Sequence, residues 1–343
     1  MICLQNKGLM PLEAATTFGI NVKIGENPIG FFGTGLKYAI AVCLRLGGKF
    51  QLFLGEVEYE FYTKDEDFRG TSFGMIYMKK RRGLFSSWTE EKLGYTTELG
   101  KHWEPWMAVR ELESNCRDEQ GTSYLSDGIP FLADDETLIS VTCPEMEAAY
   151  KDLSSIFMPE KKLIFSSGMI NIYEGESDYI FFRGLRVTDL PRPSLFTYDF
   201  DLGVTLTEDR TSRWPASDSM RIMEAIMTST NLEMINKIMD AEDNKYFEGT
   251  LPFDQPYIAP ATTFYAAMGF RAAEDLPMPT RIRTMYRNMT SVRDRKELLY
   301  ISITEHNLRW LVAFLEEHDF SDDESEEIIK SCKEALENKE INF

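Results

Sequence analysis

Histidine and patterned cysteine are scarce in this sequence. It has 3 histidines with no H-x-x-x-H pair, and its 5 cysteines are scattered, odd in number and without a C-x-x-C spacing. These absences exclude the common zinc motifs and a disulfide framework, and they are typical of reduced thiols in a cytosol. No apolar run approaches the roughly 18 residues of a membrane span, and no charged-then-apolar leader is present. We expect a cytoplasmic protein with no membrane segment.

Positive charge is the next deficit. The chain has 37 Lys and Arg against 56 Asp and Glu, which gives a formal net charge of −19. A surface this negative repels phosphates, so direct nucleic-acid binding is disfavoured. The only compact basic run is KKRRG at 79–83, which is either a ligand patch or a solvated loop.

The length and the apolar content are sufficient for two globular domains of α+β class. The chain has 343 residues, 43% hydrophobic and 13% aromatic, so each half can bury its own core. We place a first domain at 1–160 and a second at 161–343, which is β-rich over 162–207 and then helical.

Hydrophobic periodicity and Gly/Pro punctuation predict the main elements. In the first domain, strand patterns fall at 49–55, 57–63, 71–79 and 137–143, and helix patterns at 9–19, 36–46 and 100–120. In the second domain, helix patterns fall at 218–242, 295–320 and 321–340.

A glycine cluster, IGFFGTGLK at 29–37, opens the predicted helix at 36–46. Glycines at Gly30, Gly33 and Gly35 leave backbone N–H groups open to an anion at the helix N-terminus. The segment lacks the GK[ST] of a P-loop and the strand context of a dinucleotide-binding fingerprint. A tight packing turn is the alternative explanation. Lys37 and Lys23 are either phosphate contacts or solvated side chains.

A second motif, RELESNCRDEQG at 110–121, places Glu111, Asn115 and Asp118 on one helix face. Asparagine supplies a neutral oxygen ligand to Mg²⁺, and a glutamate that is not a ligand can act as general base toward water. A solvated acidic helix face is the alternative.

Over residues 1–145 these segments together resemble the GHKL ATPase superfamily (gyrase B, heat-shock chaperones, histidine kinases and MutL). RELESNCRDE resembles the N box, and IGFFGTGLKYAIA resembles the second glycine box. NKGLMPLEAATTFGINVK is similar to the first glycine box and lid of MORC-type members, and FRGTSFGMIYM to the closing Gly-Thr strand.

The resemblance implies ATP and Mg²⁺ as ligands and assigns roles to single residues. Glu111 would activate water and Asn115 would hold Mg²⁺, with Asp118 in support. The phosphates would lie against the second glycine box and two lysines: Gly30, Phe32, Gly33, Thr34, Gly35, Leu36, Lys37 and Lys23. The adenine would lie near Gly8 and Thr71, with Asn6 where the family has an aspartate, and 19–30 would be the lid.

The order of these motifs departs from the family. The glycine boxes and closing strands precede the N box here, so the resemblance implies a circularly permuted Bergerat-type sandwich of helices on a mixed sheet. The strand at 137–143 would then lie beside MICLQN at the N-terminus. The short chain and the permuted order suggest a phage or mobile-element protein.

Three functions remain open from the sequence. The first is Mg²⁺-dependent ATP binding with slow hydrolysis, coupled to movement of the lid and of the second domain. The second is a nucleotide-gated interaction module with negligible turnover, acting through its acidic surface on a host or assembly partner. The resemblance also makes a homodimer plausible. The third is an acidic protein that acts by surface charge alone, such as a DNA mimic. Arg210, in LTEDRT at 206–211, is either a contact to the nucleotide or a local salt bridge.

Overall fold

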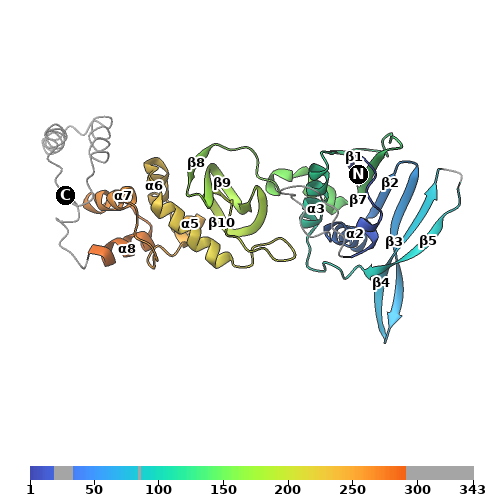
Figure 1. Ribbon diagram of the computed structural model, residues 1–343. Helices are drawn as coiled ribbons and strands as arrows, with labels where there is room; N and C mark the ends of the chain where they lie inside the picture. The colour runs from blue at the N-terminus through green and yellow to red at the C-terminus, as the bar shows by residue number, and fades with distance from the viewer. Residues whose placement is uncertain (19–33, 84–85, 291–343) are drawn as a thin grey trace. The chain divides into compact units, whose positions relative to one another are not determined.

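The structure is a computed structural model that describes residues 1–18, 34–83 and 86–290 (Figure 1). Its contacts divide the chain into two units. Unit 1 comprises Met1–Met158 together with the short segment Thr207–Arg210, and unit 2 comprises Pro159–Leu206 and Thr211–Phe343. The segment Thr207–Arg210 lies far along the chain yet packs in the first unit, and it is important for the site described below.

Unit 1 is built on one seven-stranded sheet. Its strands are β1 (Ile2–Lys7), β2 (Lys49–Leu54), β3 (Val57–Phe68), β4 (Thr71–Arg82), β5 (Thr89–Thr96), β6 (Thr122–Leu125) and β7 (Glu136–Thr142). The order across the sheet is β5-β4-β3-β2-β7-β1-β6, and every described pair is antiparallel. The mixed sheet expected from the resemblance is therefore wrong for this part of the chain. Short hairpin connections, as between β2, β3 and β4, can join only antiparallel neighbours.

Strand β1 lies between β7 and β6. Ile2 pairs with Val141 of β7 and with Leu125 of β6. The prediction that the strand at 137–143 lies beside the N-terminal strand is confirmed. Because the pair is antiparallel, the end of β7 lies beside the start of β1.

Helices α2 (Gly35–Arg45) and α3 (Pro105–Asp118) pack on this sheet and against each other (Figure 1). Helix α2 is buried on nearly all sides from Leu36 to Cys43, as expected of an apolar helix between two layers. It ends just before Gly47, whose φ of 74° is a conformation that glycine adopts without strain. Three short helices complete the described part of the unit: α1 (Glu13–Thr16), α4 (Pro144–Lys151) and η1 (Leu153–Ser155).

The basic run at 79–83 lies on β4, where acidic residues of the neighbouring strand neutralise it. Lys79 pairs with Glu60 at 2.8 Å, and Arg81 pairs with Glu58 at 2.6 Å. These are cross-strand partners in the register of β3 and β4. The run is therefore paired inside the sheet, which argues against a patch that attracts anions.

Unit 2 combines a three-stranded antiparallel sheet with helices. The sheet has the order β10-β9-β8, from β8 (Leu163–Ser166), β9 (Ile170–Phe182) and β10 (Leu185–Phe200). The helices are α5 (Pro215–Thr228), α6 (Leu232–Met239), η2 (Phe247–Thr250), α7 (Thr262–Ala273) and α8 (Thr280–Thr290). The single helix predicted over 218–242 is wrong, because Ser229 takes an extended conformation and the Asn231 side chain caps α6 by accepting from Met234 N. The predicted helices at 295–320 and 321–340 lie outside the described residues.

A buried carboxyl group lies in the core of unit 2. Glu248 of η2 is 1% exposed, and its carboxylate accepts hydrogen bonds from Tyr198 Oη at 2.6 Å and from Leu195 N at 3.0 Å. Burial raises the pKa of this carboxyl to about 7, although these hydrogen bonds oppose the shift. Burial likewise raises the pKa of Asp199 to about 6.

We therefore expect unit 2 to lose stability as the pH rises. In the unfolded chain Glu248 titrates near its ordinary pKa of 4.5, whereas in the folded chain it titrates near 7. The protonated form is favoured by folding, so the free energy of unfolding falls between about pH 4.5 and 7, by no more than about 3 kcal/mol for this group. Urea unfolding at pH 5 and pH 8 measures the difference.

The control compares two glutamates of the same unit. Glu248→Gln should reduce the pH dependence between pH 5 and 8, whereas Glu174→Gln, at a position that is 61% exposed, should leave it unchanged. Equal pH dependence in wild type and Glu248→Gln would contradict the assignment.

Candidate functional site

Two of the predicted motifs meet where α2 begins. The first residue of that helix, Gly35, lies directly against Glu111 of α3. A methyl group added at Gly35 would lie 2.9 Å from Cδ and 3.0 Å from Cγ of Glu111, and closer still to its Oε2. Only glycine allows the backbone and the carboxylate to approach so closely.

Two arginines hold the Glu111 carboxylate, which is 2% exposed. Arg210 Nη2 lies 3.0 Å from its Oε2, and Arg110 Nε lies 3.6 Å from its Oε1. Both guanidinium groups are themselves buried. A buried carboxylate requires such partners because desolvation of an unpaired charge is costly.

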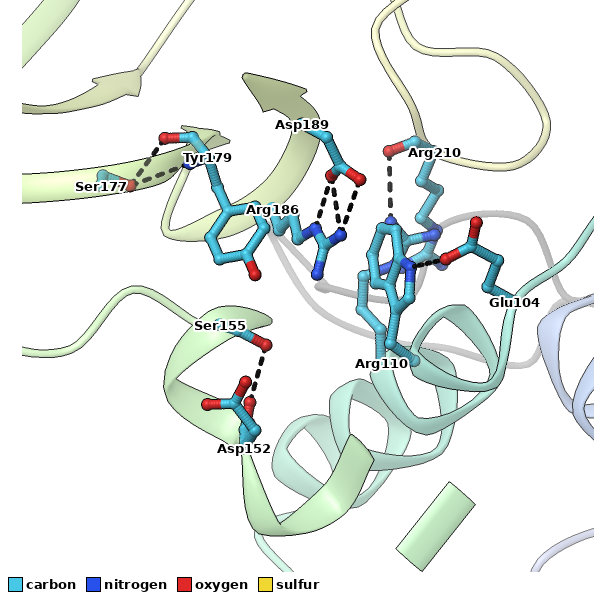
Figure 2. Close-up of polar contacts among 10 residues, drawn as sticks. Glu104, Arg110, Asp152, Ser155, Ser177, Tyr179, Arg186, Asp189 and Arg210 are labelled. Atoms are coloured by element: carbon cyan, nitrogen blue, oxygen red, sulfur yellow. Dashed lines mark hydrogen bonds and ion pairs between the residues drawn. The ribbon is translucent and has the colours of Figure 1, made fainter. Parts of the chain in front are cut away.

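Arg210 belongs to the segment Thr207–Arg210, which we call the TEDR segment after its sequence. Arg110 donates from Nη2 to the carbonyl of Asp209 at 2.6 Å and from Nη1 to the carbonyl of Arg210 at 3.4 Å. Figure 2 shows the bond between Arg110 and the carbonyl of Arg210. The indole N–H of Trp106, one turn earlier on α3, donates to Glu104. The segment is thus bound through its backbone as well as through Arg210.

Its two acidic side chains also have partners in unit 1. Tyr38 of α2 donates its hydroxyl to Glu208, and the indole N–H of Trp103 donates to Asp209 at 2.5 Å. The rings of Tyr38 and Trp103 lie against each other, with centroids 4.6 Å apart. Burial and the Glu208 hydrogen bond together raise the pKa of Tyr38. The hydroxyl therefore stays protonated and donates at neutral pH.

Lys37 is placed differently from the sequence expectation. Its side chain is 0% exposed, and Nζ donates to the carbonyl of Ala14 at 2.8 Å. Burial lowers the pKa of its ammonium group. Lys37 thereby joins α2 to α1, the segment that resembles the first glycine box.

The remaining described residues of the segment that resembles the second glycine box lie next to Gly35. Thr34 precedes α2 and its carbonyl accepts from the N–H groups of Lys37 and Tyr38, whereas the Leu36 side chain is buried. Lys23, Gly30, Phe32, Gly33 and the predicted lid at 19–30 fall outside the described residues.

Helix α3 also reaches the predicted adenine side. Gly121, just after the helix, lies against Cys116 Sγ and against Asn6 at the end of β1. Gly8 follows with a φ of 88°, its N–H bound to the carbonyl of Asp135 at 2.7 Å. Asn6 therefore lies beside the residue that follows the C-terminal end of α3, whereas Gly35 lies at Glu111, two turns before that end.

Asn115 and Asp118 are partly buried on α3 between these two ends. Among the described residues there is no cluster of three or more His, Cys, Asp or Glu side chains that could hold a metal ion. A cation at Asn115 would therefore need ligands from outside this set, such as phosphate oxygens and water. Burial raises the pKa of the neighbouring Cys116 thiol to about 11, which suits an inert thiol.

Thr71 is not brought to this site. It is the exposed first residue of β4 and pairs with Phe68 across the turn of the β3–β4 hairpin. Figure 1 shows that hairpin tip projecting away from α2 and α3. The adenine contact expected for Thr71 has no support from this position.

Sequence reasoning missed the groups that enclose Glu111 and receive the TEDR segment, namely Tyr38, Trp103 and Arg110. In the sequence, Arg110 stands out only as part of the motif RELESNCRDE. The helical periodicity indicates that Arg110 is buried, and a buried arginine needs an acceptor. The pattern does not identify that acceptor, the Asp209 carbonyl, because it lies about 100 residues away.

Unit 2 has its own buried arginine, which is neutralised locally. Arg186 of β10 donates from Nε and Nη2 to the Asp189 carboxylate, each at 2.8 Å, and its guanidinium lies 4.0 Å from the centroid of the Tyr179 ring (Figure 2). Its charge is paired within the bulged end of β10, a structural role.

Comparison of the chain with protein-family models, with curated proteins and with solved structures gave no match. In the described part of the chain, none of the helices combines the length and the apolar character needed to cross a bilayer.

Proposed function

We propose that unit 1 is an ATP-binding domain that uses Mg²⁺ and hydrolyses the nucleotide slowly, in the manner of the GHKL superfamily that its motifs resemble. The observation that carries the proposal is the contact between Gly35 and Glu111, which are 76 positions apart in the sequence. Gly35 belongs to the motif that we assign to the phosphates, and Glu111 belongs to the motif that we assign to water activation.

The arrangement along α3 supports the same assignment. Glu111, Asn115 and Asp118 follow one another along α3, with Gly35 against Glu111 and Asn6 against Gly121, which lies just after the helix. Helix N-termini favour anions through their backbone N–H groups and their partial positive charge, so the N-terminus of α2 is a candidate site for a phosphate. The phosphates would lie there and the adenine would lie toward Asn6 and Gly8.

We further propose that the domain is a circular permutant of the family arrangement. The end of β7 lies beside the start of β1, where a short turn would connect them in the unpermuted order. The antiparallel hairpin geometry of this pair needs only a few residues of connection.

The Mg²⁺ ion would be held by the amide oxygen of Asn115, and it would neutralise the phosphate charge and orient the phosphates. Glu111 is the base in this proposal, and its Oε1 has no hydrogen-bond donor among the described residues. A buried acceptor without a donor is suited to a water molecule or a ligand hydroxyl.

One observation favours the alternative, a nucleotide-gated interaction module with negligible turnover. Glu111 is 2% exposed and paired with Arg210, so it does not face water in this state. The protein partner or second copy would then respond to the bound nucleotide, ATP or ADP, and not to hydrolysis.

Calorimetric titration tests binding, and a turnover assay separates the two candidates. We expect a non-hydrolysable ATP analogue to bind in the presence of Mg²⁺, and Asn115→Ala to weaken this binding at least 10-fold. Asn231→Ala, at a helix cap in unit 2, is the matched control and should bind as wild type does. Absence of Mg²⁺-dependent binding by the wild type would refute the proposal.

For hydrolysis, Glu111→Ala should lower the rate by at least 100-fold with analogue binding retained, because loss of a general base typically costs a factor of about 10² to 10⁴. Equal, very slow rates in wild type and variant would favour the interaction module.

A further inference from the structure

The TEDR segment covers the proposed catalytic base. Arg210 occupies Oε2 of Glu111, Gly35 lies against the same oxygen, and the carboxylate is 2% exposed. A general base must lie within hydrogen-bonding reach of its water, directly or through one other water. In this arrangement the described residues close off the Oε2 side from water.

The segment is bound as a unit and at more than one point. Glu208 accepts from Tyr38, Asp209 accepts from Trp103, and the carbonyls of Asp209 and Arg210 accept from Arg110. Each of these groups would otherwise need water, so the donors of Tyr38, Trp103 and Arg110 match the acceptors of the segment in both charge and hydrogen-bonding pattern.

The bound conformation also contains strain. Arg210 has a φ of 52°, in the left-handed region that non-glycine residues adopt at a cost of roughly 1 to 2 kcal/mol. Its N–H closes a tight turn onto the carbonyl of Thr207 at 3.0 Å. Release of the segment would relieve this strain, which lowers the net free-energy cost of detaching the segment from its partners in unit 1.

From these contacts we infer that the TEDR segment is a releasable inhibitory element: the Glu111–Arg210 pair holds it closed over the base, and a bound nucleotide frees it by drawing Arg210 away from Glu111. The inference rests on the proposed function, because release requires a nucleotide phosphate near Glu111. A nucleotide phosphate that binds the Arg210 guanidinium only in the released state would shift the equilibrium from the bound segment to the released segment.

Hydrogen exchange at the backbone N–H of Arg210 tests the inference in two arms. In the first arm, without nucleotide, Glu111→Gln should raise the exchange rate at least 10-fold, because the charge that holds Arg210 is lost. Glu113→Gln is the matched control on the same helix, since Glu113 pairs with Arg117. Tyr38→Phe, which keeps the ring and removes one hydrogen bond to the segment, should give a smaller rise of about 3-fold. Unchanged exchange in Glu111→Gln and Tyr38→Phe would overturn the inference.

In the second arm, wild-type protein is saturated with the Mg²⁺ complex of the ATP analogue. The inference requires at least 10-fold faster exchange at Arg210 on saturation. Binding by calorimetry with unchanged or slower exchange would overturn release while leaving the proposed function intact. Absence of binding would refute the proposed function, and release by nucleotide with it, whereas the first arm would still decide whether the ion pair holds the segment.

Discussion

Arg110→Met should destabilise unit 1 by about 3 kcal/mol or more. The Arg110 side chain is 0% exposed and donates to two backbone carbonyls of the TEDR segment while facing the buried Glu111 carboxylate. Methionine retains much of the volume but removes the donors and one positive charge. Each buried acceptor left unpaired costs about 1 to 3 kcal/mol, and a broken buried ion pair costs about 3 to 5. Urea unfolding followed by tryptophan fluorescence measures the loss.

The control for this prediction is an arginine at the surface of the same unit. Arg82 is 77% exposed and pairs with Glu56, which is 57% exposed, at 3.1 Å. Because exposed pairs contribute little, Arg82→Met should change the free energy of unfolding by less than about 1 kcal/mol. Similar losses in the two variants would show that Arg110 is not the buried anchor that its contacts indicate.

Gly35→Ala should have the second large effect. The added methyl would overlap the Glu111 side chain, with Cδ and Cγ at 2.9 and 3.0 Å. A glutamate at the surface would simply rotate away, but this carboxylate is buried and held by Arg210. We expect a loss of about 1 to 3 kcal/mol from overpacking and, if the proposed function holds, at least 10-fold weaker binding of the ATP analogue.

Gly94→Ala is the matched control. Gly94 lies in β5, and a methyl group there would meet no atom within 4 Å. The stability and the analogue binding of Gly94→Ala should match those of the wild type. If Gly94→Ala lost as much binding as Gly35→Ala, the binding loss could not be attributed to the contact between Gly35 and Glu111. Thermal unfolding and calorimetric titration of both variants provide the comparison.

Much of unit 1 was predictable from the local pattern of the chain. The helix at 36–46, the three strands after it and the strand at 137–143 all appear in the structure at or near the expected residues. Their signals are the period of apolar residues and the glycines that end them, which act over a few residues. The neighbouring positions of β1 and β7 followed from the order of motifs and not from any local signal.

Lys37 shows what the local pattern leaves undetermined. A lysine two residues after a glycine turn suggests a phosphate contact, yet this one is buried in an apolar helix and bound to Ala14. The sequence around it, from Leu36 to Cys43, is apolar on every face, which already indicates a helix enclosed on all sides. A charged residue in such a helix needs an internal acceptor, and α1 supplies it.

The sequence by itself determined the α+β class, most of the elements of unit 1 and the residues Gly35 and Glu111 as a candidate pair, because these depend on short-range periodicity and on recognisable motifs. Only the tertiary structure decided that the sheet of unit 1 is antiparallel, that the TEDR segment packs in unit 1, and that Arg110 and Arg210 enclose Glu111. The packing of the TEDR segment and the Arg210–Glu111 pair depend on contacts between residues about 100 positions apart. Their free energy comes from burial and charge pairing in the folded chain, which no local pattern of residues encodes.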